Sequence, residues 1–306
     1  MTTEAPPLPP PPIAVVAPAP PIAATAPPLP AAAPAPIQRP FTIVQEGANP
    51  SASGPLKMMV YGTYGSGKTY LAGTAQQVEQ MRDVLYLDVE GGSRTLVGRG
   101  IDRIPCQNFT TLNWIKEWLI RHAQLREAGN IDGLRNWQSQ VTGSVPDQPR
   151  QYRTIIIDSL SELAKLLLLE LSGVKIGASH LDAQIDNPQS EEWGQLSARI
   201  SLLVRTFVNL PFHIIFVASA VEKEDEVKRR FFQPNFNGKM AKDVQGFLDC
   251  VAYLAVQHNE AGESQRVLSL TPGRNYDAKH RFTGATKTQI ANPSMADIFA
   301  LHTGGK

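Results

Sequence analysis

A glycine-rich segment between a short apolar run and a helix-like stretch constrains the fold of this chain more than any other feature. The apolar run covers residues 58–61, and apolar residues recur at helical spacing over 68–80. The segment matches the phosphate-binding loop pattern at every fixed position. Glycines let backbone N–H groups converge on phosphate oxygens because no Cβ stands in the way. The loop comprises Gly62, Thr63, Tyr64, Gly65, Ser66, Gly67, Lys68 and Thr69.

Two side chains of this loop indicate that it binds ATP with Mg²⁺. In such loops the lysine, here Lys68, reaches the β- and γ-phosphates, and the hydroxyl, here Thr69, ligates Mg²⁺. The start of the following helix adds partial positive charge beside the phosphates. The alternative interpretation is a glycine-rich turn with an exposed lysine. We therefore predict an ATP site that depends on Mg²⁺, with Lys68 as a catalytic residue.

An aspartate at the end of another apolar run completes the predicted metal site. Residues 154–157 have no polar face, as expected for a strand of a parallel sheet that is covered on both sides, and Asp158 follows directly. The carboxyl ends of parallel strands share one edge of the sheet, so we expect Asp158 beside the loop. There it would hold the Mg²⁺ shell through water. The alternative is an aspartate that caps the next helix.

A glutamate follows the strand predicted over residues 84–89. We predict that Glu90 orients the attacking water and accepts its proton, given hydrogen-bond reach to the γ-phosphate. Asp88 alternates with it, in a position to form a cap or a local hydrogen bond. The alternative interpretation is a solvated acidic turn.

The remaining pattern predicts an α/β fold with a mainly parallel sheet, because strands alternate with helices. After residue 218 the character changes to a β-rich C-terminal portion with a charged hairpin or loop at 222–247. Residues 130–151 are polar and are predicted to form an inserted loop. Further strands are predicted at 101–106, 214–218, 249–257 and 266–271, and further helices at 111–129, 161–171, 191–208 and 294–302.

The first 40 residues differ in composition from the rest of the chain. They contain 15 of the 25 prolines and 11 alanines, with Glu4 and Arg39 as their charged residues. Such a segment cannot bury a core, so we predict a disordered or polyproline-like tail at 1–40 and one domain at 41–306. The tail lacks the basic region of a signal peptide, and prolines break its apolar run. With two cysteines and no predicted membrane span, we expect a cytoplasmic protein.

A cluster of cations and phenylalanines lies in the predicted hairpin. The formal net charge of the chain is +1, so any contact with nucleic acid must be local. Cations with interleaved aromatic rings suit single-stranded DNA, through phosphate contacts and base stacking. The alternative is a solvated hairpin in which opposite charges pair across the strands and the phenylalanines pack on the domain. The candidate DNA-binding residues are Lys228, Arg229, Arg230 and Phe232.

Over roughly residues 41–300, the order of these motifs resembles phage-encoded RecA-like ATPases. In AAA+ motors the metal-binding aspartate is usually followed by the catalytic glutamate, whereas here Asp158 is followed by Ser159 and Glu90 ends an earlier strand. The resemblance implies a RecA-like phosphate-binding-loop NTPase core. It also implies ATP hydrolysis, action on single-stranded DNA in phage recombination or replication, assembly into a ring or filament, and, for a phage protein, location in the host cytoplasm.

Three further residues take their expected roles from this resemblance. Ser219 stands where RecA proteins carry a polar sensor, and Lys279 or Arg281 corresponds to the interfacial basic residues that reach a neighbouring subunit's γ-phosphate. The alternative for the latter two is a surface basic pair. Two other functions stay open: a motor or remodelling ATPase with a protein partner, and a small-molecule kinase. Stimulation of ATP hydrolysis by DNA would separate the first function from these two.

Overall fold

The computed structural model describes residues 54–173, 189–224, 228–236, 240–258 and 262–304. All of them belong to the second of the two units of the chain, Glu46–Lys306. The predicted tail at 1–40 and its boundary with the domain lie outside the described residues.

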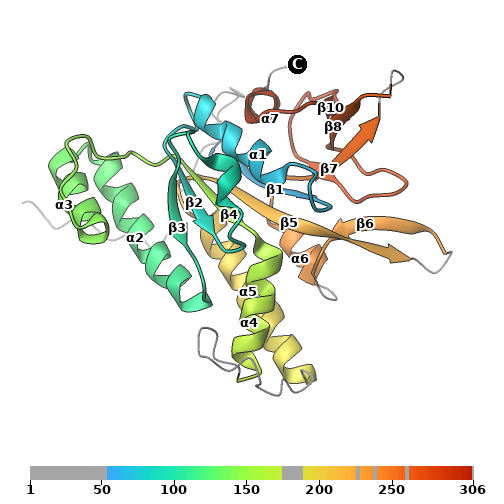
Figure 1. Cartoon of the computed structure of the whole chain (residues 1–306), viewed down its shortest axis with the longest axis horizontal. Helices are drawn as coiled ribbons and strands as arrows, with labels where there is room; N and C mark the ends of the chain where they lie inside the picture. Colours follow the sequence, from blue (N-terminus) through green and yellow to red (C-terminus); the bar gives the residue numbers. More distant parts are fainter. Residues whose placement is uncertain (1–53, 174–188, 225–227, 237–239, 259–261, 305–306) are drawn as a thin grey trace, which may run out of the picture. The chain divides into compact units, whose positions relative to one another are not determined.

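A mainly parallel sheet forms the centre of the domain (Figure 1). In the described part of the chain the strand order is β10-β8-β7-β1-β5-β4-β2-β3, with β6 paired to β5 and β9 paired to β7. Neighbours from β7 to β3 are parallel, whereas β6, β8, β9 and β10 pair antiparallel. The strands are β1 (Lys57–Gly62), β2 (Val84–Asp88), β3 (Asp102–Pro105), β4 (Thr154–Asp158), β5 (His213–Glu224), β6 (Arg230–Pro234), β7 (Cys250–His258), β8 (Ser264–Ser269), β9 (Lys279–His280) and β10 (Gln289–Ala291).

Helices cover both faces of this sheet and produce two apolar cores. Along β1, Met59 and Tyr61 join the core beneath α2, α4, α5 and α6, while Met58 and Val60 join the core beneath α1 and α7. Burial on both faces explains the apolar runs of β1, β2 and β4. The helices are α1 (Lys68–Gly73), the 3₁₀ turns η2 (Thr74–Gln77) and η3 (Ser93–Leu96), α2 (Phe109–Glu127), α3 (Ile131–Thr142), α4 (Leu160–Leu171), α5 (Ser190–Val208), α6 (Met240–Gly246) and α7 (Met295–His302).

The predicted polar loop at 130–151 is wrong for its first half, which forms α3. The Asn130 side chain caps this helix by accepting from the Gly133 amide, and Gly143 ends it in a left-handed conformation with φ 75°. Leu134 is fully buried, and the Trp137 indole donates to the Trp118 carbonyl of α2 at 3.1 Å. A narrow stripe of buried and hydrogen-bonded side chains therefore holds this mostly polar helix against α2.

The helix predicted over 68–80 is also shorter than expected. It ends at Gly73, and the chain tightens into η2. A Cβ on Gly73 would lie 2.4 Å from Leu96 Cδ2, so the backbone and that side chain are in close contact here. Thr74 donates to the Leu71 carbonyl and accepts from the Met295 amide of α7, which ties the end of the helix to the C-terminal part of the domain.

The charged hairpin predicted within 222–247 is confirmed as the pairing of β5 with β6, although the prediction missed α6. Strand β5 is twelve residues long, and its two halves have different neighbours. Residues 214–219 lie in the sheet between β1 and β4, whereas residues 220–224 pair with β6. The pair leaves the sheet as a two-stranded ribbon (Figure 1). One strand thus connects the centre of the sheet to the hairpin.

Candidate functional site

The glycine-rich loop lies at the carboxyl edge of the sheet, between β1 and α1. Gly65 and Gly67 adopt left-handed φ values of 75° and 96°, which side chains with a Cβ rarely adopt. A Cβ at Gly62 would lie 2.2 Å from the Leu254 carbonyl oxygen of β7. The spacing of the motif is therefore required by this backbone path, which exposes the loop amides in the manner of a phosphate cradle.

The predicted metal ligands meet at this edge. The Thr69 hydroxyl donates to Asp158 Oδ2 at 2.5 Å, and the Tyr86 hydroxyl donates to the same oxygen at 3.1 Å. The Asp158 carbonyl accepts from the amides of Val89 at 2.8 Å and Glu90 at 3.2 Å. The ends of β2 and β4 are thereby held together, with Glu90 directly beside Asp158. Sequence reasoning missed Tyr86, a hydroxyl within an otherwise apolar run.

Lys68 and Asp158 influence each other's protonation. Burial lowers the pKa of the Lys68 ammonium, and the nearby carboxylates of Asp158 and Glu90 oppose that shift. Burial raises the pKa of Asp158, the Thr69 hydrogen bond lowers it, and Glu90 adds to the rise. Lys68 Nζ also donates to the Thr63 carbonyl at 2.9 Å. The three predicted catalytic residues therefore form one electrostatic group.

The two carboxylates of the 88–90 segment have different environments. Asp88 is buried, accepts from the Gly91 amide at 2.8 Å and pairs with Arg103 at 2.9 Å. Glu90 is exposed, and its carboxylate has no hydrogen-bond partner among the described residues. Asp88 therefore supports the turn, while Glu90 is available to accept a proton.

Two orphaned hydroxyls test whether these residues fit MgATP. Ser66 Oγ in the loop and Ser219 Oγ on β5 are buried without a hydrogen-bond partner in the described part of the chain. Ser219 is paired in register with Gly62. Buried polar atoms without a partner require an explanation, and a phosphate or its water shell supplies one. The residues fit: Lys68 would hold the phosphates, and Thr69 with Asp158 would hold Mg²⁺, which neutralises charge on the β- and γ-phosphate oxygens when bound.

The proposed intersubunit cations lie at the other edge of the sheet. Lys279 on β9 pairs with Val251 near the start of β7. Arg281 donates to the Gly246 carbonyl at 2.8 Å and lies 3.8 Å from Asp249, which accepts from the backbone amide at the amino end of β1. Neither residue is placed beside the loop of its own chain, so a role at a neighbour's nucleotide stays a prediction.

The hairpin cations are exposed, whereas the phenylalanine is engaged by the domain. Lys228, Arg229 and Arg230 are all exposed, and Arg230 lies 3.7 Å from Glu224 across the ribbon. The half-buried Phe232 ring stacks on Tyr253, with centroids 5.5 Å apart and planes tilted by 13°. This packing agrees with the alternative interpretation for the aromatic residue and leaves the cations as the DNA-binding candidates.

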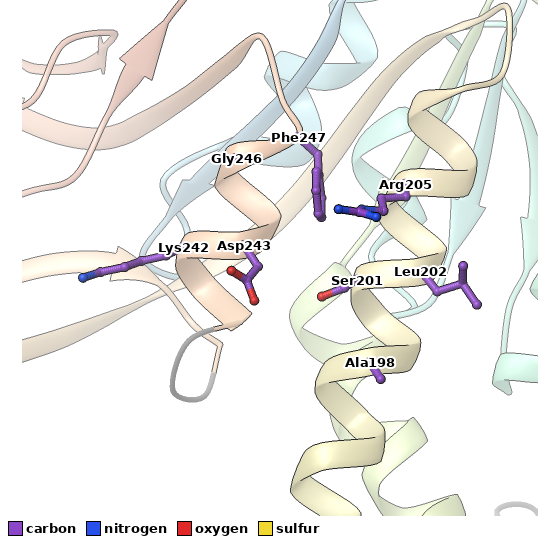
Figure 2. Close-up of a pocket in the computed structure, with 8 residues that line it drawn as sticks. All are labelled: Ala198, Ser201, Leu202, Arg205, Lys242, Asp243, Gly246 and Phe247. Carbon is purple, nitrogen blue, oxygen red and sulfur yellow. The ribbon is translucent and has the colours of Figure 1, made fainter.

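A hollow of about 590 Å³ lies between α5 and α6 (Figure 2). The Arg205 guanidinium lies 4.5 Å from the centre of the Phe247 ring, which closes one end of the hollow. None of the predicted site residues lines it. The lining residues are Ala198, Ser201, Leu202, Arg205, Lys242, Asp243, Gly246 and Phe247.

In the ranges of the chain that the structure describes, no group of three or more His, Cys, Asp or Glu side chains is arranged to hold a metal ion. No helix in those same ranges has the length and apolar character needed to cross a membrane.

Three solved structures are similar to this chain at low sequence identity. The RadB recombinase is 14% identical, with 78% of this chain and 87% of that chain covered and a TM-score of 0.38. The flagellar accessory protein FlaH from Methanocaldococcus jannaschii is 11% identical, with 78% and 87% covered and a TM-score of 0.34. The pCW3 conjugation coupling protein TcpA, a monomer with ATPγS, is 14% identical, with 74% and 59% covered and a TM-score of 0.34. No curated protein matches the chain in sequence.

A family model described as an AAA domain matches residues 54–282, which is most of the chain and includes the residues predicted to bind the nucleotide. The match agrees with the mainly parallel sheet around β1, and the predicted RecA-like α/β fold of phosphate-binding-loop NTPases is confirmed. The chain belongs to this AAA domain family of ATP-binding and ATP-hydrolysing proteins.

Proposed function

We propose that this ATPase depends on Mg²⁺ and acts on single-stranded DNA, with β5 connecting the nucleotide to the DNA-binding hairpin. The observation that carries the proposal is the continuity of β5, which runs from Ser219, opposite Gly62 of the loop, to Glu224 in the ribbon. The resemblance to phage-encoded RecA-like ATPases further supports a role in phage recombination or replication.

The residues of the chain divide the chemistry among them. Lys68 balances the negative charge that builds up on the transferred phosphoryl group. Glu90 accepts the proton of the attacking water, because its carboxylate is exposed beside Asp158 and lacks another partner among the described residues. Asp158 and Thr69 hold Mg²⁺, and Asp158→Asn should weaken Mg²⁺-dependent ATP binding more than metal-free binding.

Ser219 supplies the proposed link between ATP and DNA. Its buried hydroxyl is orphaned within the described residues, and its amide donates to Ser161 Oγ at 3.1 Å. A hydroxyl can donate to a phosphate oxygen, and it can donate to or accept from a bound water, so Ser219 responds to the γ-phosphate. A shift of Ser219 would move the same strand that carries the hairpin. Ser219→Ala should therefore reduce DNA stimulation of hydrolysis more than basal hydrolysis.

The test measures ATP hydrolysis and DNA affinity with Mg²⁺ and a poly(dT) oligonucleotide over a range of salt concentrations. We expect salt-sensitive binding and faster hydrolysis with DNA. Replacing Lys228, Arg229 and Arg230 together by Ala should reduce the slope of log affinity against log salt by about 2, since each phosphate contact on a single strand contributes about 0.7. Basal hydrolysis should stay within twofold, because the loop is unchanged.

The matched control replaces three other exposed cations, Arg82, Arg121 and Lys287, by Ala. It changes the net charge by the same amount but leaves the ribbon intact, so its DNA affinity should equal that of the wild type. Equal losses in the two triple variants would indicate a non-specific charge effect. Wild-type protein that hydrolyses ATP without any salt-sensitive DNA binding would exclude DNA as the client. A protein partner would then be the better account, and phosphate transfer to a small acceptor would indicate a kinase.

We also propose that the active form is a homo-oligomer, a ring or a filament, in which Lys279 or Arg281 contacts a neighbour's nucleotide. Both lie away from the loop of their own chain, which is the position that a contact between subunits requires. Mixing Lys68→Ala protein with Arg281→Ala protein tests this. The first variant keeps Arg281, the second keeps an intact nucleotide loop, and a shared site needs one of each. Recovery of hydrolysis in the mixture supports a shared site, and purely additive activity of the two variants contradicts it.

A further inference from the structure

Arg266 on β8 lies directly against the nucleotide loop, although no motif marked it. Strand β8 pairs with β7, and Arg266 is opposite Val256, three residues beyond Tyr253, where the pairing of β7 with β1 ends. This places Arg266 past the end of β1, above the loop. Its Nε donates to the Ser66 carbonyl at 3.1 Å, and a Cβ on Gly67 would lie 2.4 Å from that nitrogen.

The backbone holds Arg266 firmly in this position, while the end of its side chain is open. The Asn292 amide donates to the Arg266 carbonyl at 2.6 Å, and the Arg266 amide donates to Asn292 Oδ1 at 3.1 Å. Arg266 is exposed and forms no ion pair with a carboxylate among the described residues. Both Nη groups likewise lack a partner there. A guanidinium with open donors beside a phosphate-binding loop is suited to bind an anion.

The strand order decides which end of the nucleotide Arg266 faces. Glu90 and Asp158, which define the γ-phosphate end, follow β2 and β4, which lie on one side of β1. Arg266 reaches the loop from the other side of β1, through β7 and β8. We propose that Arg266 is a further nucleotide-binding residue, whose Nη groups contact the α-phosphate and ribose of the nucleotide bound to its own chain.

This role differs from that of an arginine that acts on the γ-phosphate. The α-phosphate and ribose are present in ATP and ADP alike, so Arg266 should contribute equally to the affinity for both. An arginine that contacts the transferred group would instead favour ATP and raise the rate of hydrolysis. Hydrogen bonds to charged groups typically contribute about 1.5–3 kcal/mol, which corresponds to an affinity change of about 10- to 100-fold.

The experiment measures dissociation constants for ATP and ADP with Mg²⁺ by calorimetry for Arg266→Ala, Arg266→Gln and the wild type. Gln keeps a donor that can reach the Ser66 carbonyl but lacks the charge and the second donor group. We expect both variants to bind ATP and ADP about 10- to 100-fold more weakly, with an unchanged ratio between the two nucleotides. Arg121→Ala, which removes an exposed arginine from α2, serves as the matched control and should bind like the wild type.

Each contrary result identifies what fails. Wild-type affinity in Arg266→Gln would show that Arg266 only supports the loop through Ser66, and loss of ATP affinity alone would show a γ-phosphate contact; either overturns the proposal. Wild-type affinity in both variants would overturn it as well. The inference rests on the nucleotide site at Lys68, so a wild-type protein that binds neither nucleotide would remove that site and this inference together. Thermal unfolding of each variant identifies any that fails to fold, in which case Arg266→Lys, which keeps the charge without the fork of donors, should show an intermediate loss.

Discussion

Replacement of Glu90 by Gln tests the chemical step most directly, because it changes one oxygen to nitrogen and leaves the size of the side chain unchanged. The backbone contact of residue 90 with the Asp158 carbonyl does not depend on the side chain, so the segment should keep its position. The amide cannot accept the proton of the attacking water. We therefore expect ATP to bind with the same affinity or slightly more tightly, since the variant removes a negative charge close to the γ-phosphate.

The expected loss of rate follows from general-base catalysis. Such a base typically accelerates the chemical step 10²- to 10⁴-fold. Its loss therefore raises the activation free energy by about 3–5 kcal/mol. Single-turnover hydrolysis of labelled ATP gives the rate of the chemical step, and a separate titration with a non-hydrolysable analogue gives the affinity. Hydrolysis within a few-fold of the wild type would refute the role of Glu90. Equal losses of affinity and rate would indicate that Glu90 holds the structure instead.

Asp88 provides the matched control two residues earlier in the same segment. Because Asp88 is buried and bound to Arg103 and the Gly91 amide, Asp88→Asn should lower stability by about 1–3 kcal/mol. Below its unfolding temperature this variant should hydrolyse ATP within a few-fold of the wild type. A collapse of hydrolysis in a folded Asp88→Asn protein, with Glu90→Gln active, would exchange the roles that we assign to the two carboxylates.

Three other perturbations test separate parts of the structure. Lys68→Ala should abolish hydrolysis and weaken ATP binding strongly, as measured by calorimetry, and unchanged turnover would contradict the nucleotide site. Phe232→Ala removes the ring stacked on Tyr253, so it should lower the free energy of unfolding by about 2 kcal/mol in urea titrations while the salt slope of DNA binding stays constant. Burial lowers the pKa of His122 from 6.5 to about 4, so the folded state binds fewer protons than the unfolded state between these values. Stability is therefore fully present above pH 6.5 and falls as the pH drops towards 4, and His122→Gln should reduce the loss between pH 7.5 and 4.5 by about 2 to 3 kcal/mol.

The sequence was sufficient to predict the parts of the fold that lie in the covered parallel sheet. Strands buried on both faces contain few polar residues, so β1, β2 and β4 are visible as apolar runs, and β2 and β4 end in an aspartate. The parallel arrangement brings the carboxyl ends of these strands to one edge, which is why the sequence predicts that Lys68, Asp158 and Glu90 belong to one site.

Elements that depend on a few tertiary contacts could not be predicted. Helix α3 is held by Leu134, Trp137 and hydrogen bonds of Gln138 with the Arg150 backbone, and its remaining surface is polar. The loop motif does not include Arg266, because this residue lies 200 positions after Ser66 in the sequence. The pairing of β7 with β1 and of β8 with β7 brings it to the loop. Phe232 lies among exposed cations in the sequence, so its neighbours along the chain do not indicate that its ring packs on the domain. The ring stacks on Tyr253, which belongs to another strand.

The position of β1 within the sheet separates the two roles that we propose at the nucleotide. On one side, β5, β4 and β2 carry or precede Ser219, Asp158 and Glu90, to which we assign roles at the γ-phosphate. On the other side, β7 and β8 bring Arg266 to the loop, where we propose that it contacts the part of the nucleotide that does not change in the reaction. Among the described strands, β5 leaves the sheet on the first side and forms the cationic ribbon with β6. Since a signal to DNA must differ between ATP and ADP, it has to start from the γ-phosphate, and among the described strands β5 is the one that touches the loop strand and also reaches the hairpin.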